Sequence, residues 1–311
     1  MPYRNYIRFI CVLGCLLGYL QATSVSAMDI VNIAQGASQR DFRTIYKKAV
    51  FQGALDRTVA EFGPYQLNSD GPTMTNKRAM QELSTSGSLI NAYIAVTNAE
   101  WEKHAHVVRI PVRRGLLNYR LLLIHKDRLS LFENVETLDD LKRLRAGSQT
   151  HWVTTSVLKS AGFRVVEGSD YEGLFKMLSN FRFDFLLRGA NEIFGELEQT
   201  HLDLENIVVE PSLALLIPSP VYVFVSPRSP RLIKRLEKGL ELMVQDGSLK
   251  ALFYQYHIDN VLKADLQNRR ILEVTNPLLP EDTPLDRPEL WYSIGEKIPS
   301  GIEKINIPPE Y

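Results

Sequence analysis

Cysteine is scarce in this sequence of 311 residues. Only Cys11 and Cys15 occur, and both lie in an apolar stretch near the N-terminus. If that stretch is removed on maturation, the remaining chain has no cysteine at all. Disulfides, thiol nucleophiles and cysteine–metal sites are then excluded together.

An excess of charge of one sign is also missing, since 36 basic residues stand against 36 acidic ones. Removing Arg4 and Arg8 with the N-terminal stretch leaves 34 basic against 36 acidic residues, a net charge of −2. This balance offers no basis for binding nucleic acid or an anionic membrane surface.

The N-terminal stretch has the features of a signal peptide. Basic residues precede the apolar run Phe9–Leu20, and small residues end at Val25-Ser26-Ala27. The run is too short to span a membrane as a stable helix, and no later segment approaches that length. We predict export to the periplasm with cleavage after Ala27. The alternative is lipidation of Cys15 at a Gly14-Cys15 site, which the large Leu13 disfavours.

The length suits two lobes rather than one core, and long β-type runs occur where two lobes would join. The first pair is Val107–Val112 and Tyr119–Ile124, and a second long run is Leu213–Val225. We interpret them as paired crossovers between two α/β lobes. Consecutive apolar residues in Tyr119–Ile124 indicate a strand buried on both faces, as in a largely parallel sheet.

Strand and helix patterns alternate on both sides of these runs, which predicts an α/β fold. A single helix is expected over Phe42–Phe62, ended by Gly63-Pro64. Proline-rich residues 271–311 are predicted to form an extended C-terminal tail on the surface. The other principal expectations are strands at Asp29–Ala34, Tyr65–Asn68, Leu89–Val96, Phe163–Val166 and Phe183–Leu187, and helices capped by Thr137, by Ser169-Asp170 and by Ser229-Pro230.

Four segments, in this order, resemble the family-3 extracellular (periplasmic) solute-binding proteins. They are Lys77–Leu83, Thr137–Leu141, Gly173–Leu178 with Arg182-Phe183-Asp184, and Leu240–Tyr256. The resemblance covers residues 29–257. It implies a two-lobed, type II periplasmic-binding-protein-like fold with two hinge strands. We expect one lobe from residues 28–117 plus 226–270 and the other from 118–225.

The resemblance further implies a monomer, without cofactor or metal, that closes on a small polar or charged solute. The solute would be amino-acid-like or an organic anion, delivered to an ABC-type permease or to a membrane sensor. In such proteins an arginine three residues after Thr97 would hold the ligand carboxylate, but this chain has Glu100 there. The ammonium-binding aspartate falls near Arg188-Gly189. The ligand is therefore not expected to be a standard α-amino acid.

Candidate ligand-binding residues lie where predicted strands end, because ligands of open α/β sheets bind there. In the second lobe, Arg188 follows a buried strand. Each second-lobe candidate could instead have a purely structural role, as a turn, helix-cap or core residue. The second-lobe set is Thr150, His151, Trp152, Arg188, Asn191 and Glu192. The first-lobe set is Arg40, Asp70, Thr97 and Trp101, each of which alone is more typical of surface.

Motifs for catalysis are weak. Ser156–Lys159 matches Ser-x-x-Lys without its companion motifs, and His104 and His106 would share one strand face without a third metal ligand. We therefore predict that the protein is not an enzyme. The alternative is a periplasmic enzyme on the same frame, of the dehydratase or lytic-transglycosylase kind, with Glu192 or Glu196 as general acid.

Overall fold

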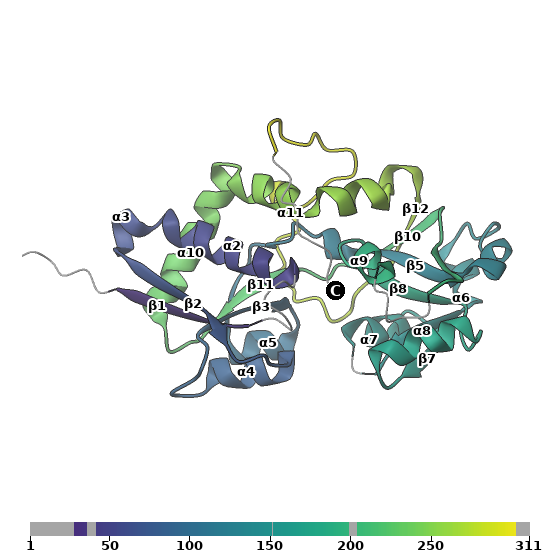
Figure 1. The fold of residues 1–311 in the computed structure, drawn as a ribbon, viewed down its shortest axis with the longest axis horizontal. Helices are drawn as coiled ribbons and strands as arrows, with labels where there is room; N and C mark the ends of the chain where they lie inside the picture. The colour runs from purple at the N-terminus through teal and green to yellow at the C-terminus, as the bar shows by residue number, and fades with distance from the viewer. Residues whose placement is uncertain (1–27, 36–41, 151, 199–203, 303–311) are drawn as a thin grey trace, which may run out of the picture.

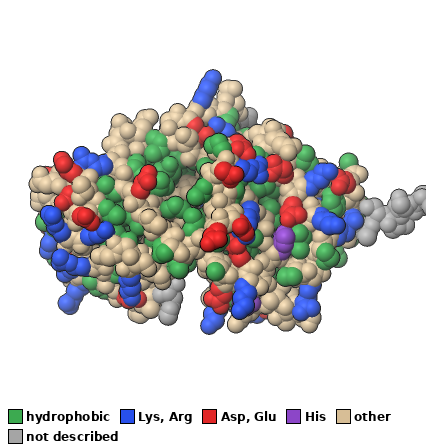
Figure 2. All heavy atoms as spheres, turned by 180° about the vertical axis from the view of Figure 1, so that it is seen from behind, with side chains coloured by type: hydrophobic (Ala, Val, Ile, Leu, Met, Phe, Trp, Pro, Cys, Tyr) green, Lys and Arg blue, Asp and Glu red, His purple; other side chains and the backbone are tan. Residues whose placement is uncertain are grey.

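The computed structural model describes residues 28–35, 42–150, 152–198 and 204–302. Two lobes lie side by side, with helix α11 (Ser248–Ala264) running across both (Figure 1). Seen from behind, the lower outline of the molecule is notched between the lobes (Figure 2). The predicted signal peptide and the candidates Arg40 and His151 lie outside the described residues. Within the described residues, no helix is both long and apolar enough to cross a membrane.

The first lobe is built on a three-stranded antiparallel sheet and a parallel strand pair. The sheet has the order β3 (Ala92–Val96), β11 (Val221–Val225), β4 (His106–Val108), and the pair is β1 (Asp29–Ala34) with β2 (Tyr65–Gly71). The helices of this lobe are α2 (Phe42–Asp56), α3 (Val59–Phe62), α4 (Asn76–Ser84), α5 (Ala99–His104) and α10 (Pro230–Gln245).

One helix had been predicted over Phe42–Phe62, and the structure divides it into α2 and α3. The Thr58 hydroxyl donates back to the carbonyls of Leu55 at 2.8 Å and Ala54 at 3.1 Å. This side chain competes with the helical backbone bonds, so α2 ends here. Gly63, with φ of 74°, ends α3 as expected.

The second lobe is built on a mixed sheet. Its order is β12-β10-β5-β8-β6-β7, with β9 beside β5. The strands are β5 (Tyr119–His125), β6 (Arg145–Gln149), β7 (Arg164–Gly168), β8 (Phe185–Gly189), β9 (Ile207–Val209), β10 (Leu213–Leu216) and β12 (Arg270–Glu273). The helices are α6 (Leu138–Lys142), α7 (Val153–Ser160), α8 (Tyr171–Ser179) and α9 (Ile193–Leu197), and the 3₁₀ turns are η1 (Leu116–Asn118), η2 (Lys126–Leu131), η3 (Leu266–Asn268) and η4 (Pro288–Leu290).

The prediction that Tyr119–Ile124 belongs to a largely parallel sheet was wrong. Strand β5 is antiparallel to β8, β9 and β10. Its central residues are buried, as expected. An apolar run reports burial on both faces of a strand, whatever the direction of its neighbours.

Two chain crossovers join the lobes, as predicted, although Leu213–Val225 is not one strand. It forms β10 and β11 in different lobes, and residues 217–220 between them make the second crossover. Residues 109–118 make the first. The two are hydrogen-bonded together, from Val112 N to Val221 O at 3.0 Å and from Ile217 N to Asn118 O at 2.8 Å. Pro218 and Pro220 lack the N–H groups of a continuous ladder, which explains the break.

The C-terminal region differs from the predicted surface tail. Residues Arg270–Glu273 form β12, an edge strand parallel to β10, before the first proline of the region. Beyond them Val274, Thr283, Leu290 and Tyr292 are buried. Proline content therefore excluded a central strand correctly but did not predict exposure.

Candidate functional site

Side chains of several elements converge where the second-lobe sheet meets the hinge. Strands β6 and β8 are parallel, so their carboxyl ends share one edge of the sheet. The start of β5 lies at the same edge, because Arg120 pairs with Gly189. The first crossover enters β5 at this point, and the edge therefore adjoins the first lobe.

Arg188, at the end of β8, is held by its neighbours. Its Nε donates to Glu196 Oε2 at 2.7 Å, and an Nη contacts the other oxygen of Glu196. Its guanidinium lies 4.7 Å from the Trp152 ring centroid and 5.5 Å from that of Tyr171. Burial opposes the charge of Arg188, but Glu196 outweighs it and raises its pKa above the usual range. The prediction that Arg188 and Trp152 lie close together is therefore correct. The charge of Arg188, however, is already neutralised by Glu196.

Asn191 and Glu192 fold back over the end of β8. Asn191 is 6% exposed, and its Oδ1 accepts no hydrogen bond from the described residues. Glu192 Oε2 lies 3.4 Å from an Nη of Arg188. A Cβ on Gly189 would stand 2.9 Å from Asn191 Oδ1 and 3.2 Å from Glu192 Oε2. Glycine at this position lets both polar side chains approach the strand.

Arg120, on β5, is the residue that the sequence analysis missed. Its side chain is 7% exposed, its Nε has no hydrogen-bond partner, and it forms no ion pair with a carboxylate of the described residues. Burial lowers the pKa of Arg120 to about 10, with Glu192 favouring the charge and Arg188 opposing it. Arg120 therefore stays cationic at neutral pH without a direct counter-ion. The sequence did contain a signal for this residue, since Arg120 directly precedes the apolar run of the predicted strand Tyr119–Ile124.

Thr150 does not start helix α7. Its hydroxyl donates to the Gly168 carbonyl at 3.2 Å, and its backbone N–H donates to the same oxygen at 3.0 Å. Trp152 holds the N-cap position without a side-chain capping bond. The alternative reading of Thr150 as a helix cap was thus wrong. Its place beside Trp152 keeps it near the candidate site.

The first-lobe candidates do not gather around one point. Thr97 is buried at the second crossover, with its hydroxyl 2.7 Å from Glu102 Oε1 and its N–H bonded to Pro220 O. Trp101 is 5% exposed and stacks on Tyr93 with 5.6 Å between ring centroids. Asp70 is exposed near the end of β2. Their ligand roles stay predictions, and Trp101 has little surface to offer.

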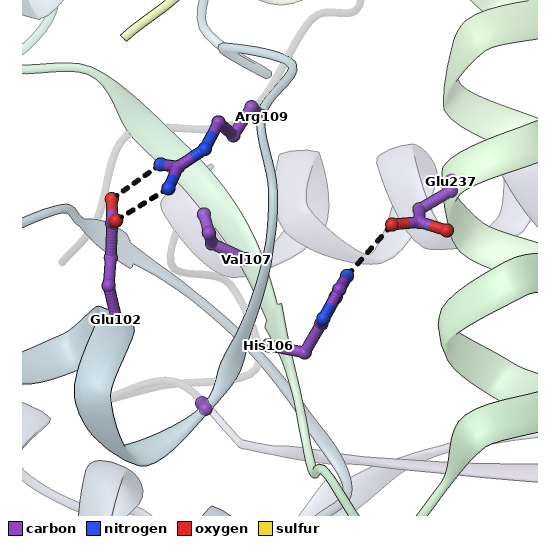
Figure 3. Close-up of a pocket in the computed structure, with 6 residues that line it drawn as sticks. Glu102, His106, Val107, Arg109 and Glu237 are labelled. Carbon is purple, nitrogen blue, oxygen red and sulfur yellow. Dashed lines mark hydrogen bonds and ion pairs between the residues drawn. The ribbon is translucent and has the colours of Figure 1, made fainter. Parts of the chain in front are cut away.

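A shallow hollow of about 450 Å³ lies on the first lobe, away from this site (Figure 3). Its charged side chains face one another in pairs. Arg109 binds both oxygens of Glu102 at 2.8 Å, and His106 Nε2 lies 2.8 Å from Glu237. His104 ends α5 and does not share a strand with His106, contrary to prediction. Among the described residues, no three potential ligands cluster to hold a metal.

Two α/β lobes joined by two hydrogen-bonded crossovers define a divergent, type II periplasmic-binding-protein-like fold. No family model and no curated protein matches the sequence. Among solved structures, the periplasmic VFT2 domain of BvgS from Bordetella pertussis is similar, with a TM-score of 0.51 and 15% identity over 73% of this chain and 93% of that one.

Two further structures are similar at lower scores. An ancestral arginine-binding protein bound to arginine has a TM-score of 0.49 and 17% identity, over 73% of this chain and 97% of that one. A histidine kinase sensor domain with similarity to periplasmic binding proteins has a TM-score of 0.47 and 11% identity, over 74% and 95%. The similarity to the VFT2 domain, at 15% identity, supports the fold alone, and it agrees with the predicted fold class.

Proposed function

We propose that the protein is an exported solute-binding protein that closes on a small anionic or zwitterionic solute. One observation carries the proposal, the buried guanidinium of Arg120, whose Nε has no hydrogen-bond partner and which forms no ion pair among the described residues. An uncompensated buried charge costs several kcal/mol of folding free energy. A carboxylate arriving from solution would remove that cost, and a guanidinium binds a carboxylate with two parallel hydrogen bonds.

Acceptor groups beside Arg120 favour a second polar end on the solute. Asn191 Oδ1 has no donor among the described residues, and the carboxylate of Glu192 favours the charge of Arg120. The Asn191 oxygen would accept a bond from an ammonium or hydroxyl group. This arrangement suits an amino-acid-like solute, or a hydroxylated organic anion.

Arg188 takes a different role from the one expected. Glu196 already neutralises it, so we assign the grip on the anion to Arg120. Arg188 instead positions Glu192 and supports Trp152. Both oxygens of Glu196 accept bonds from Arg188, which leaves neither free to deliver a proton. This geometry gives no support to the enzyme alternative.

The cellular setting belongs to the same proposal. The predicted signal peptide supports export to the periplasm, where the partner would be an ABC-type permease or a membrane sensor. The predicted lobe boundaries, 28–117 with 226–270 and 118–225, stay part of the proposal, except that β11 (Val221–Val225) pairs within the first-lobe sheet. Loss of solute uptake on deletion of the gene would favour a permease, and loss of a transcriptional response would favour a sensor.

Thermal unfolding with a panel of amino acids, organic acids, polyamines and sugars tests binding. A solute at 100 times its Kd stabilises the folded state by about 2.7 kcal/mol. A carboxylate-bearing solute should raise the Tm of the wild-type protein and leave that of Arg120→Met unchanged. Unchanged melting across the whole panel, or an equal shift in Arg120→Met, would contradict the proposal.

A further inference from the structure

The C-terminal segment 275–302, here called the strap, crosses the hinge twice. It leaves edge strand β12 of the second lobe, reaches the first lobe, and returns, passing across the hinge region in Figure 1. On the way it binds the second crossover, where Asn276 Nδ2 donates to Pro218 O at 2.7 Å. On the first lobe Asp282 pairs with Arg109 at 3.1 Å, and Arg287 pairs with Glu241 at 2.9 Å.

The strap is fitted against the first crossover. Arg114 and Gly115 there have left-handed backbones, with φ of 46° and 73°. A Cβ on Gly115 would stand 2.7 Å from the Trp291 ring, so only glycine allows the ring to lie there. Tyr292 N donates to Arg114 O at 2.6 Å, which ties the two backbones together.

Glu296 joins three parts of the molecule. Its carboxylate pairs with Arg114 of the first crossover, accepts from Lys250 Nζ at 2.9 Å and accepts from Tyr254 OH at 2.8 Å. Lys250 and Tyr254 belong to α11. The Arg114 side chain is buried, and it also donates to the Trp291 carbonyl at 2.7 Å. Removing Glu296 would therefore leave a buried cation beside the hinge.

The far end of the strap lies on the second lobe. Tyr292 meets Tyr119 of β5 edge-on, with 6.0 Å between ring centroids. Ile294, Ile298 and Ile302 pack on the core formed by β5, β8, α8 and α11. Leu290 and Trp291, just before them, pack on the core of the first lobe. Within a few residues the strap thus changes lobes.

We propose that the strap is a brace that restricts rotation of the two lobes, with Glu296 as its latch. Rotation about the hinge changes the backbone angles of the crossovers, since these are the strand connections between the lobes. Arg114 cannot follow such a change while Glu296 holds it against α11. Breaking the latch widens the range of lobe angles. This device does not depend on the proposed solute.

The test measures the distance between lobes in the full mature chain. That chain has no cysteine after the predicted signal, so Lys77→Cys on α4 and Lys176→Cys on α8 can carry two spin labels. Both positions are exposed, and the helices lie on opposite lobes (Figure 1). The distance distribution from double electron–electron resonance should be narrow in this background. Adding Glu296→Gln should broaden it by several ångströms.

Glu289→Gln is the matched control, because it removes an exposed strap carboxylate whose ion pair among the described residues is with Arg287, also of the strap. It should leave the distribution unchanged. A Glu296→Gln protein that melts earlier but keeps the parent distance distribution would overturn the proposal. If Glu296→Gln does not fold by circular dichroism, Tyr254→Phe, which removes one bond to Glu296, takes its place. A narrow parent-like distribution in that variant would overturn the proposal equally.

Discussion

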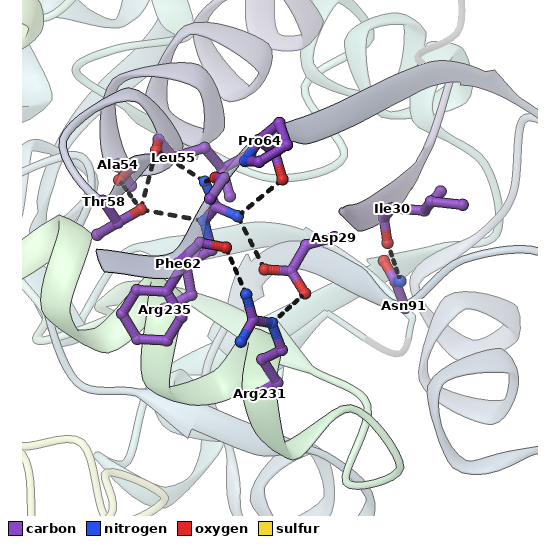
Figure 4. Close-up of polar contacts among 11 residues, drawn as sticks. Asp29, Ile30, Ala54, Leu55, Thr58, Phe62, Pro64, Asn91, Arg231 and Arg235 are labelled. Atoms are coloured by element: carbon purple, nitrogen blue, oxygen red, sulfur yellow. Dashed lines mark hydrogen bonds and ion pairs between the residues drawn. The ribbon is translucent and has the colours of Figure 1, made fainter. Parts of the chain in front are cut away.

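Two buried arginines, one in each lobe, have opposite surroundings. Arg235 in the first lobe is 0% exposed and donates to Asp29 at 2.8 Å, to Thr58 at 3.1 Å and to backbone carbonyls (Figure 4). Those carbonyls belong to Leu55, Gly63 and Pro64. Arg120 in the second lobe is similarly buried, yet its Nε has no partner in the described chain.

The difference separates a structural charge from one available to a ligand. Arg235 satisfies the end of α2, the end of α3 and the start of β1 with one planar group. Its burial is compensated, so it contributes to stability. The Nε of Arg120 has no partner among the described residues, so the burial of this charge is less fully compensated and costs stability. Completeness of hydrogen bonding, rather than depth, is what distinguishes the two.

Arg235→Met should have the largest effect. It removes a donor from three carbonyls and from the Thr58 hydroxyl, and within the described chain Arg231 is then the one cation left beside Asp29. We expect a loss of about 3–5 kcal/mol in the free energy of unfolding, measured by urea denaturation. Exposed Arg164→Met is the control and should change it by less than about 0.5 kcal/mol. A loss under about 1 kcal/mol for Arg235→Met, which would be typical of a surface residue, would remove the comparison.

Arg188→Met should come next. It leaves the buried carboxylate of Glu196 without its guanidinium partner. We expect a loss of about 3 kcal/mol in the free energy of unfolding, the lower end of the range for a broken buried ion pair. The lower end applies because Glu192, the second carboxylate beside Arg188, is partly exposed to solvent. Adding Glu196→Met should recover most of the loss, since replacing a whole buried pair by apolar groups is often neutral. A double variant as unstable as Arg188→Met alone would show that the unpaired carboxylate of Glu196 is not the cause of the lost stability.

Arg120→Met should act in the opposite direction. Without a charge to desolvate, the unliganded protein should gain about 1–2 kcal/mol, while stabilisation by the solute disappears. The two readouts come from the same melting curves with and without solute. If Arg120→Met destabilises the unliganded protein as Arg235→Met does, Arg120 is structural and the contrast between the lobes fails.

Glu102→Gln should have the smallest effect, and it should depend on pH. Burial opposes the charge of Glu102, but Arg109 and Thr97 outweigh it and lower its pKa below the unfolded value. The ion pair therefore stabilises the folded state above pH 4.3, the unfolded pKa, and is lost as pH falls through the folded pKa. We expect a loss of about 1 kcal/mol at pH 7. Its difference from wild type should shrink below pH 4, as measured by urea denaturation at several pH values.

The sequence predicted local elements better than their partners in space. Strand β1 has the predicted bounds Asp29–Ala34, and Thr137 caps α6 as expected, with Asp140 completing a capping box. Glycine often follows the end of a helix, yet Gly147 lies inside β6. The buried part of the C-terminal region was missed because its burial depends on the hinge, more than a hundred residues earlier in the chain for Arg114.

The candidate site was predicted in part for the same reason. Arg188, Asn191 and Glu192 follow one another along the chain, so a strand-to-helix junction placed them together. Trp152 joins them through parallel pairing of β6 and β8. Arg120 lies at this edge of the sheet because β5 is antiparallel to β8. Since β5 was expected to lie in a parallel sheet, Arg120 was not selected as a candidate.

The position of β11 sets an order on folding during synthesis. This strand lies between β3 and β4 and, in the part of the chain that the structure describes, no other strand joins them, yet it follows the whole of β5–β10 along the chain. The first lobe therefore leaves the ribosome first but cannot complete its sheet until residue 225 has been made. Domains whose segments are contiguous fold as each one emerges. Here the lobe that starts the chain has to wait for the strand that follows the other lobe.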